Sequence, residues 1–91
     1  MSTLDDTYDR LRHFLGALRE FDDALRVSLA EVKNRDASLD AQWQDEAARA
    51  YRRIFEPLTE VTEQYITQDA PRFEDFIDQK IRQLDDFLHG R

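Results

Sequence analysis

Two histidines, His13 and His89, are the side chains of this sequence best suited to acid–base chemistry or to metal binding. Asp9 precedes His13 by four residues and Asp86 precedes His89 by three, so each pair would share one face of a helix. A di-metal site in a helical bundle needs several inward carboxylates and two Glu-x-x-His pairs. Isolated pairs are more typical of surface ion pairing. We therefore predict no metal site and no bound cofactor.

No other set of residues has the spacing of a catalytic site. The sequence contains no cysteine and no glycine-rich loop that would hold a phosphate. It has adjacent acids, such as Glu74-Asp75, but neighbouring side chains on a helix point about 100° apart and do not converge on one substrate atom. The sequence therefore predicts a protein that is not an enzyme.

The composition is typical of a small, acidic, helical domain. Two glycines and two prolines in 91 residues are too few for the many tight turns of an all-β chain. Hydrophobic residues make up 41% and aromatic residues 11%, which favours a folded chain over a disordered one. A net charge of −7 argues against nucleic acid, whose phosphates require a basic surface. We predict a single all-α domain over residues 1–91.

The first residues are acidic and lack the apolar segment of a secretory signal. The longest largely apolar run, residues 14–18, is far shorter than the ~20 residues that span a bilayer. We expect no membrane insertion and a cytoplasmic location, with any export occurring without a cleaved signal peptide.

Apolar residues recur at spacings of three, four and seven in the first part of the chain. The pattern predicts a helix over about residues 4–35 that packs against another helix. Its stripe comprises Leu4, Tyr8, Leu11, Leu15, Leu18, Leu25, Leu29 and Val32. Asp22 occupies one stripe position. We expect Phe21 to turn inward while Asp22 stays at the edge and pairs with Arg26; the alternative is a polar residue that sets the register.

A second helix is predicted over about residues 40–68, after polar residues that favour a turn near residue 38. Ser38 or Asp40 would cap this helix, and Pro57 would bend it. Its stripe comprises Ala47, Tyr51, Ile54, Leu58, Val61 and Tyr65. The two helices then form an antiparallel hairpin whose apolar pairs include Leu18 with Leu58, Leu15 with Val61 and Leu11 with Tyr65.

Beyond Pro71 a further helical segment is predicted over about residues 71–89, with Gly90 as its C-terminal cap. Its apolar residues are Phe73, Phe76, Ile77, Ile81, Leu84, Phe87 and Leu88. The first helix is expected to be too short to cover them, and the earlier stripe slips out of phase near Pro71. The segment therefore either folds back as a third helix or extends the second helix. In the extended form it would bury its face in a homodimer or against a related small helical partner.

Trp43 is the only tryptophan and follows the predicted turn. It is either a plug against Val32 and Leu29 or an anchor for a partner protein. Within residues 39–51, Trp43 is followed by Asp45, by small residues and by Tyr51. Over about residues 4–69 the chain resembles the WXG-like proteins of bacterial type VII secretion, in their W-x-D variant. The resemblance implies a small, non-enzymatic partner that dimerises into a four-helix bundle, with Trp43 and Asp45 as the turn motif.

The export signal of that family is a Tyr-x-x-x-Asp/Glu motif, which Tyr65 and Asp69 match. Tyr65 also belongs to the stripe of the second helix, so a structural role is the other interpretation. We expect a protein–protein interaction module, a component or substrate of a type VII secretion-type system. The alternative is an acidic antitoxin, immunity or regulatory protein, because the net charge of −7 would steer it toward a basic partner.

Overall fold

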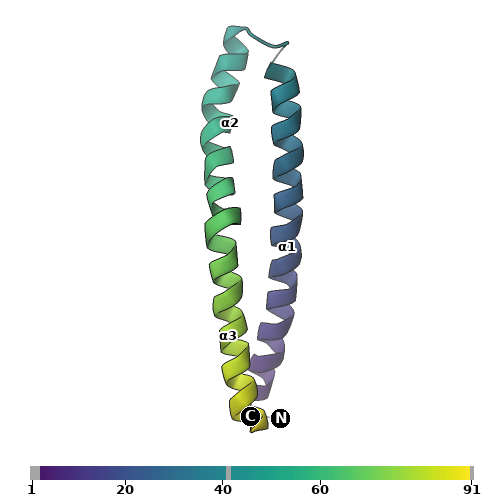
Figure 1. Cartoon of the computed structure of the whole chain (residues 1–91), viewed down its shortest axis with the longest axis vertical. Coiled ribbons are helices and arrows are strands. Elements are labelled where there is room, and N and C mark those ends of the chain that lie inside the picture. Colours follow the sequence, from purple (N-terminus) through teal and green to yellow (C-terminus); the bar gives the residue numbers. More distant parts are fainter. Residues whose placement is uncertain (1–2, 41, 91) are drawn as a thin grey trace.

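The computed structural model describes residues 3–40 and 42–90, which contain helices and no strand. These are α1 (Thr3–Asp40), α2 (Glu46–Gln64), the π-helical turn η1 (Tyr65–Asp69) and α3 (Ala70–His89). α2, η1 and α3 form one continuous arm antiparallel to α1, so α3 ends beside the start of α1 (Figure 1). The molecule measures 64 × 19 × 15 Å. The all-α hairpin is confirmed, and the segment beyond Pro71 extends the second helix.

The turn lies later in the chain than predicted. α1 continues to Asp40 through the polar residues that favoured a turn, and Leu39 prolongs its apolar repeat. Asp45, rather than Ser38 or Asp40, caps α2: its Oδ1 accepts a hydrogen bond from the backbone N–H of Ala48 at 2.9 Å. Because the cap lies five residues beyond the end of α1, the whole second arm is displaced along the sequence.

The later turn changes the register of the hairpin. Lys33 pairs with Glu63, with Nζ and Oε1 3.0 Å apart, and Arg19 pairs with Glu74, with Nε and Oε1 3.4 Å apart. Each residue of α1 therefore faces a position much later in the second arm than we predicted. The predicted register is wrong in its pairs Leu18–Leu58, Leu15–Val61 and Leu11–Tyr65.

α1 keeps the apolar stripe predicted for it. Leu15 is buried, and most of the other stripe residues are half-buried, namely Tyr8, Leu11, Leu18, Leu25 and Leu29. We call the contact between the two arms the seam. The residues of α3 that lie in it are the buried Ala70 and the half-buried Ile77, Ile81, Leu84 and Leu88. α1 is thus long enough to cover α3, and the expectation that it ends too early is wrong.

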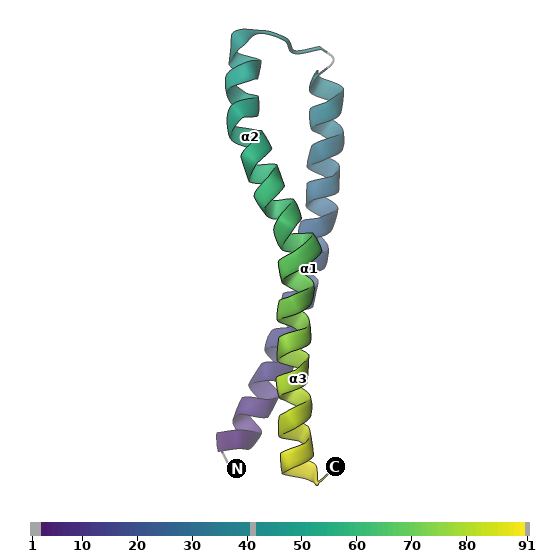
Figure 2. The ribbon, with the colours of Figure 1, turned by 60° about the vertical axis from the view of Figure 1, so that its left-hand side comes forward.

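Toward the turn the two arms separate. Most contacts between the arms join α1 to α3, whereas α1 and α2 make few. Figure 2 shows α2 slanting away from α1 as it approaches the turn. The hairpin is therefore closed at the end that holds the start of α1 and open at the turn.

The stripe predicted on α2 does not face α1. Tyr51, Ile54, Leu58 and Val61 are between 41% and 75% exposed. The buried and half-buried residues of this part of the arm are instead Ala48, Arg52, Phe55, Thr59, Thr62 and Ile66. Periodicity identifies an apolar face but not the surface that covers it. In the observed rotation, Glu63 of this arm pairs with Lys33 of α1.

The slip of the stripe near Pro71 has a structural counterpart in η1. The backbone N–H of Ala70 bonds to the carbonyl of Tyr65, five residues earlier. Proline has no backbone N–H, and its ring would clash with the carbonyl four residues before it in a regular helix. The wider turn of a π-bulge accommodates this break without ending the helix, and Pro71 then lies in the first turn of α3.

The end of α3 is as predicted. Gly90 adopts the left-handed conformation with φ of 71°, and its N–H bonds to the carbonyl of Asp86 at 3.0 Å. Among the helices described, none combines the length and apolar character needed to cross a membrane.

Candidate functional site: the two sides of the hairpin

The turn motif packs against its own helix. The half-buried Trp43 ring lies 5.8 Å from the ring of Tyr51, which stacks on Phe55 at 5.4 Å. Arg52 donates a hydrogen bond to the carbonyl of Trp43 at 2.7 Å, and Asp45 caps the helix between them. The structure thus brings Trp43 and Asp45 together at the start of α2, where they fix the path of the chain into the helix.

Tyr65 and Asp69, the residues that match an export motif, are the first and last residues of η1. The Tyr65 hydroxyl donates a hydrogen bond to Oδ1 of Asp22 at 2.7 Å, and both Tyr65 and Asp69 are half-buried. Tyr65 faces Asp22 rather than Leu11. Its hydroxyl is therefore committed to the contact between the two arms.

Asp22 is fully buried in the seam, and the expectation that it stays at the edge is wrong. Phe21 is 56% exposed and does not turn inward, while Arg26 pairs with Asp23 at 2.8 Å. While Glu74 is ionised, Oδ2 of Asp22 has no hydrogen-bond donor. A buried carboxylate without a donor is costly, so the hydrogen bond from the Tyr65 hydroxyl to Oδ1 favours the register that brings Tyr65 to Asp22.

Glu74 is the side chain that can donate a hydrogen bond to Asp22 when it is protonated. A hydrogen bond with Asp22, burial and the negative charge of Asp22 all raise the pKa of Glu74, and the guanidinium of Arg19 acts against this rise. The hydrogen bond that the Tyr65 hydroxyl donates to Asp22 raises the pKa of Tyr65 to about 12. A protonated Glu74 can donate a hydrogen bond to Asp22, whereas an ionised Glu74 places a second negative charge beside it.

The histidine at the end of α3 pairs with the acid four residues before it. Nδ1 of His89 lies 2.6 Å from Oδ1 of Asp85, rather than pairing with Asp86. The Tyr8 hydroxyl also donates to Oδ1 of Asp85, at 3.3 Å, and the Tyr8 ring meets the His89 ring edge-on at 5.6 Å. This cluster links the first turns of α1 to the last turn of α3. Over residues 3–40 and 42–90, no three potential ligands gather into a metal site.

The predicted apolar face beyond Pro71 divides into two parts. Ile77, Ile81, Leu84 and Leu88 turn toward α1 and are half-buried. Phe73, Phe76 and Phe87 lie on the outside and are each more than half exposed. The first group belongs to the hairpin's own core, whereas the three phenylalanines stay exposed to solvent.

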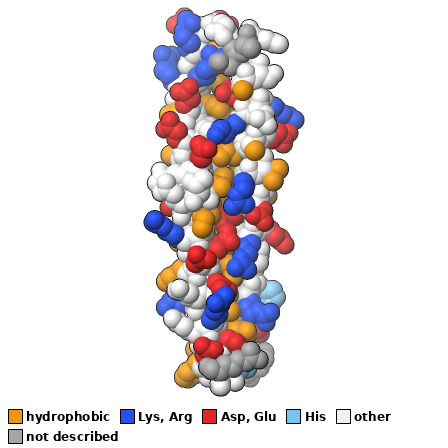
Figure 3. All heavy atoms as spheres, in the orientation of Figure 1, with side chains coloured by type: hydrophobic (Ala, Val, Ile, Leu, Met, Phe, Trp, Pro, Cys, Tyr) orange, Lys and Arg blue, Asp and Glu red, His pale blue; other side chains and the backbone are white. Residues whose placement is uncertain are grey.

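Charged residues line one side of the seam. On α1 they repeat every seven residues, as Arg12, Arg19, Arg26 and Lys33. Three acidic residues of the second arm, Glu63, Glu74 and Asp78, lie on the same side of the seam. Glu63 pairs with Lys33, and Glu74 pairs with Arg19. We call this set of seven residues the charged edge. On the face drawn in Figure 3, acidic and basic side chains gather along the junction of the two arms.

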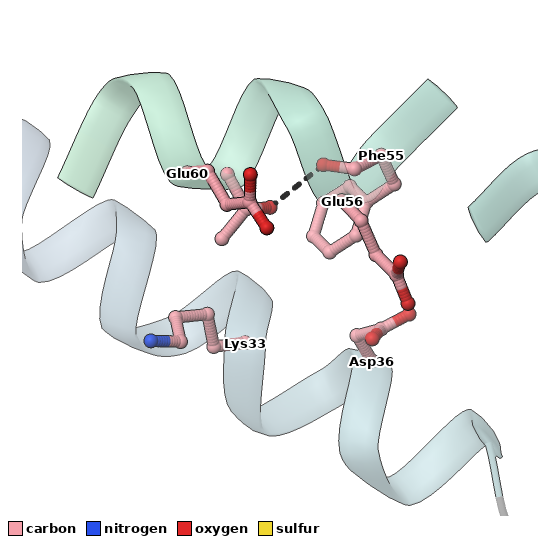
Figure 4. Close-up of a pocket in the computed structure, with 6 residues that line it drawn as sticks. Lys33, Asp36, Phe55, Glu56 and Glu60 are labelled. Atoms are coloured by element: carbon pink, nitrogen blue, oxygen red, sulfur yellow. Dashed lines mark hydrogen bonds between the residues drawn. The ribbon is translucent and has the colours of Figure 1, made fainter. Parts of the chain in front are cut away.

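A shallow pocket of about 250 Å³ opens beside the charged edge where α1 and α2 separate. Figure 4 shows the carboxylates of Asp36 and Glu56 pointing toward each other across it. Lys33 also lines this pocket, but its ammonium is paired with Glu63. The pocket is an open acidic groove and offers no enclosed place for a substrate.

Large apolar residues line the other side of the seam. We call this set the apolar face, and it comprises Phe14, Phe21, Tyr51, Ile54, Leu58, Val61, Phe73, Phe76 and Phe87, all of them exposed. A groove of about 180 Å³ on this side is lined by Leu25 and Val32 of α1 and by Leu58 of α2. The sequence pattern revealed these residues as apolar but assigned most of them to the core. The seven-residue repeat of basic residues was the available sign of which side carries the ion pairs between the two arms.

The Asp22–Tyr65–Glu74 cluster was also missed, although an acid in the middle of an apolar stripe marked its position. Comparisons with protein-family models, with curated proteins and with solved structures find no match to this chain.

Proposed function

We propose that this chain is a non-enzymatic protein–protein interaction module that pairs with another helical chain, as a WXG-like component of a type VII secretion-type system. The observation that carries the proposal is the exposure of Ile54, Leu58 and Val61, each above 60%. Burying such a side chain contributes about 1.5–3 kcal/mol. A surface of this kind is typical of proteins whose partner completes the core.

Two features of the turn support the more specific part of the proposal. The hairpin places Trp43 next to the N-terminal cap residue Asp45, and the Trp43 ring stays partly accessible at the open end. Tryptophan is among the residues that contribute most to protein interfaces. Tyr65 and Asp69 are part of the packed seam, so we interpret them as structural residues rather than as a displayed export signal.

Export of the full chain tests the link to secretion. A C-terminally tagged copy is produced in a host with an active type VII system and in the same host without its ATPase, and the culture medium and the cells are assayed. We expect ATPase-dependent export that Trp43→Ala abolishes. Val27→Ala is the control, since Val27 is exposed and lies outside the apolar face. Retention of the wild-type chain in the cells of the active host would refute the secretion role.

A further inference from the structure

We propose that η1, Asp22 and Glu74 form a pH-sensitive latch at the middle of the hairpin. With a proton on Glu74 the latch is closed and holds α2 and η1 against α1. With Glu74 ionised the latch opens, and α2 and η1 separate from α1 while α3 stays packed. Three observations carry the proposal: the π-helical turn that builds the cluster, the burial of Asp22, and the weak packing of α2. The proposal does not depend on the proposed function.

The π-helical turn brings two donors for Asp22 to one side of the second arm. Tyr65 and Glu74 are nine residues apart, and on a regular helix nine residues turn through about 900°, which would place the two side chains on opposite sides. η1 lies between them and inserts one extra residue, so the same nine residues turn only about 800°. The two side chains are then about 80° apart, and both reach Asp22.

The carboxyl group of Asp22 lies where a charge needs donors from the second arm. Asp22 is fully buried, and its Oδ1 accepts the hydrogen bond from the Tyr65 hydroxyl at 2.7 Å. Its Oδ2 gains a donor from Glu74 only when Glu74 is protonated. Because burial penalises a charge without a partner, the packed seam favours the protonated form of Glu74. The hydrogen bond with Asp22, burial and the charge of Asp22 accordingly raise the pKa of Glu74.

Arg19 offers Glu74 a second partner at the edge of the seam. The Nε of Arg19 lies 3.4 Å from Oε1 of Glu74, and the Arg19 side chain is 52% exposed. An ionised Glu74 keeps this ion pair, whereas Asp22 is then left with Tyr65 as its donor and faces a second negative charge. Loss of the proton therefore weakens the contact between the arms at Asp22.

Charged and titratable groups face Glu74 from all three elements around it. They are Arg19 and Asp22 of α1, Tyr65 and Asp69 of η1, and Asp78 of α3, one turn beyond Glu74. Tyr65 keeps its proton at neutral pH, because its pKa is raised to about 12. The carboxyl group of Glu74 has both a donor role toward Asp22 and a charged partner in Arg19, so its proton is the one that closes the latch.

α2 depends on this latch more than α3 does. α3 packs on α1 through its half-buried isoleucines and leucines, whereas the inward residues of α2 include the small, polar Thr59 and Thr62. The ion pair between Lys33 and Glu63 is about half exposed, and such pairs contribute little to stability. Figure 2 shows α2 already slanting away from α1 above η1. Opening at Asp22 therefore frees α2 before α3.

The direction of the response follows from where the proton is bound. The closed latch holds the proton and the open latch does not, so the closed population falls as the pH rises through the folded pKa of Glu74, which lies above 4.5. Opening uncovers Ile66, which is 6% exposed in the closed hairpin, together with the inward side of α2. A rise in pH thus makes the inner surface of the second arm accessible.

Hydrogen–deuterium exchange of the full chain, resolved by mass spectrometry into α2, η1 and α3, tests the latch. Rates are measured at about pH 5 and about pH 8 and corrected for the intrinsic pH dependence of amide exchange. We expect the protection of α2 and η1 to fall at least about threefold more than that of α3. Glu74→Gln is expected to keep α2 and η1 protected at both pH values, because its amide donates to Asp22. Asp75→Asn, which removes the same charge at an exposed neighbouring position, is expected to behave like the wild type.

Circular dichroism of the same samples shows whether each variant is folded. If Glu74→Gln loses helix content, Asp22→Asn replaces it, since its amide donates to an ionised Glu74 and is expected to remove the pH dependence as well. An equal fall in protection across α2, η1 and α3 would indicate global unfolding and would overturn a local latch. Equal wild-type protection at both pH values, or the same response in Glu74→Gln as in Asp75→Asn, would overturn the role of Glu74.

Discussion

Asp22 shows at the scale of one residue how a polar group in the seam determines the alignment of the two arms. It is fully buried, accepts a hydrogen bond from Tyr65, and lies where a protonated Glu74 can donate a hydrogen bond to it. A shift of one residue in the register would remove Tyr65 from Asp22 and leave the carboxylate without any donor. Leucine at this position would satisfy many alignments equally well, whereas aspartate is compatible with few.

The raised pKa of Glu74 makes the stability of the hairpin depend on pH. Its folded pKa lies above the ordinary value of 4.5, so the folded chain binds more protons than the unfolded chain. The contribution is fully present below that value, and the free energy of unfolding falls as the pH rises through the folded pKa. Tyr65, with its pKa raised to about 12, keeps its proton in this range.

Urea unfolding followed by circular dichroism between about pH 5 and pH 8 measures this dependence. Glu74→Gln is the matched variant, because its amide donates to Asp22 at every pH, and we expect it to flatten the profile. The nearby groups Arg19, Asp22 and Asp69 are unchanged in both proteins. Profiles of equal slope in the wild type and in Glu74→Gln would show that the proton on Glu74 does not contribute.

The two arms show, at the scale of elements, what the sequence can and cannot predict. The middle of the α1 stripe, from Tyr8 to Leu29, was predicted correctly because its inward residues are mostly leucines, whereas Leu4 and Val32 at its ends are exposed. On α2 the inward positions include Ala48, Thr59 and Thr62, while the larger Ile54 and Leu58 point outward. The periodic pattern therefore located an exposed apolar face and not the face that contacts α1. Local spacing alone contains no information on which surface covers a stripe.

The start of α2 was misplaced for a related reason. Ser38 and Asp40 have the chemistry of helix caps, but the continuing apolar repeat of α1 outweighs their preference for a turn. Asp45 caps α2 instead. The W-x-D resemblance identified Asp45 as part of a turn motif but did not predict that its side chain caps the helix. Pro71 was recognised as a break in the pattern, but a π-bulge needs one extra residue in the ladder, which no residue type signals.

Removing the cap tests how α2 begins. Asp45→Ala deletes the acceptor for the N–H of Ala48 and is expected to lower the free energy of unfolding by about 1 kcal/mol. Asp45→Asn keeps an acceptor oxygen and is expected to stay close to the wild type. Thermal unfolding followed by circular dichroism distinguishes them. A loss as large in Asp45→Asn as in Asp45→Ala would mean that the charge, rather than the hydrogen bond, stabilises this helix end.

At the scale of the whole molecule, the fold is a long, thin rod with a narrow seam. Among the described residues, the buried apolar side chains are limited to Leu15, Ala48, Ile66 and Ala70. Two helices packed on one side bury less apolar surface than a bundle of the same length, and domains are stable only by a small margin. A single hairpin leaves the apolar face exposed to water and so lacks the stabilisation that burying this face would contribute.

If two copies share that face, folding and association are one equilibrium, and the thermal midpoint depends on the protein concentration. Raising the concentration about a hundredfold adds about 2.7 kcal/mol per dimer, which corresponds to a rise of roughly 5–10 °C in the midpoint for a complex of this size. Val61→Asp is expected to unfold at a lower midpoint that no longer moves with concentration, whereas Val27→Asp is expected to follow the wild type. Differential scanning calorimetry at two concentrations measures both effects. A wild-type midpoint that is independent of concentration would place all of the hairpin's stability within one chain, in contradiction to the predicted homodimer.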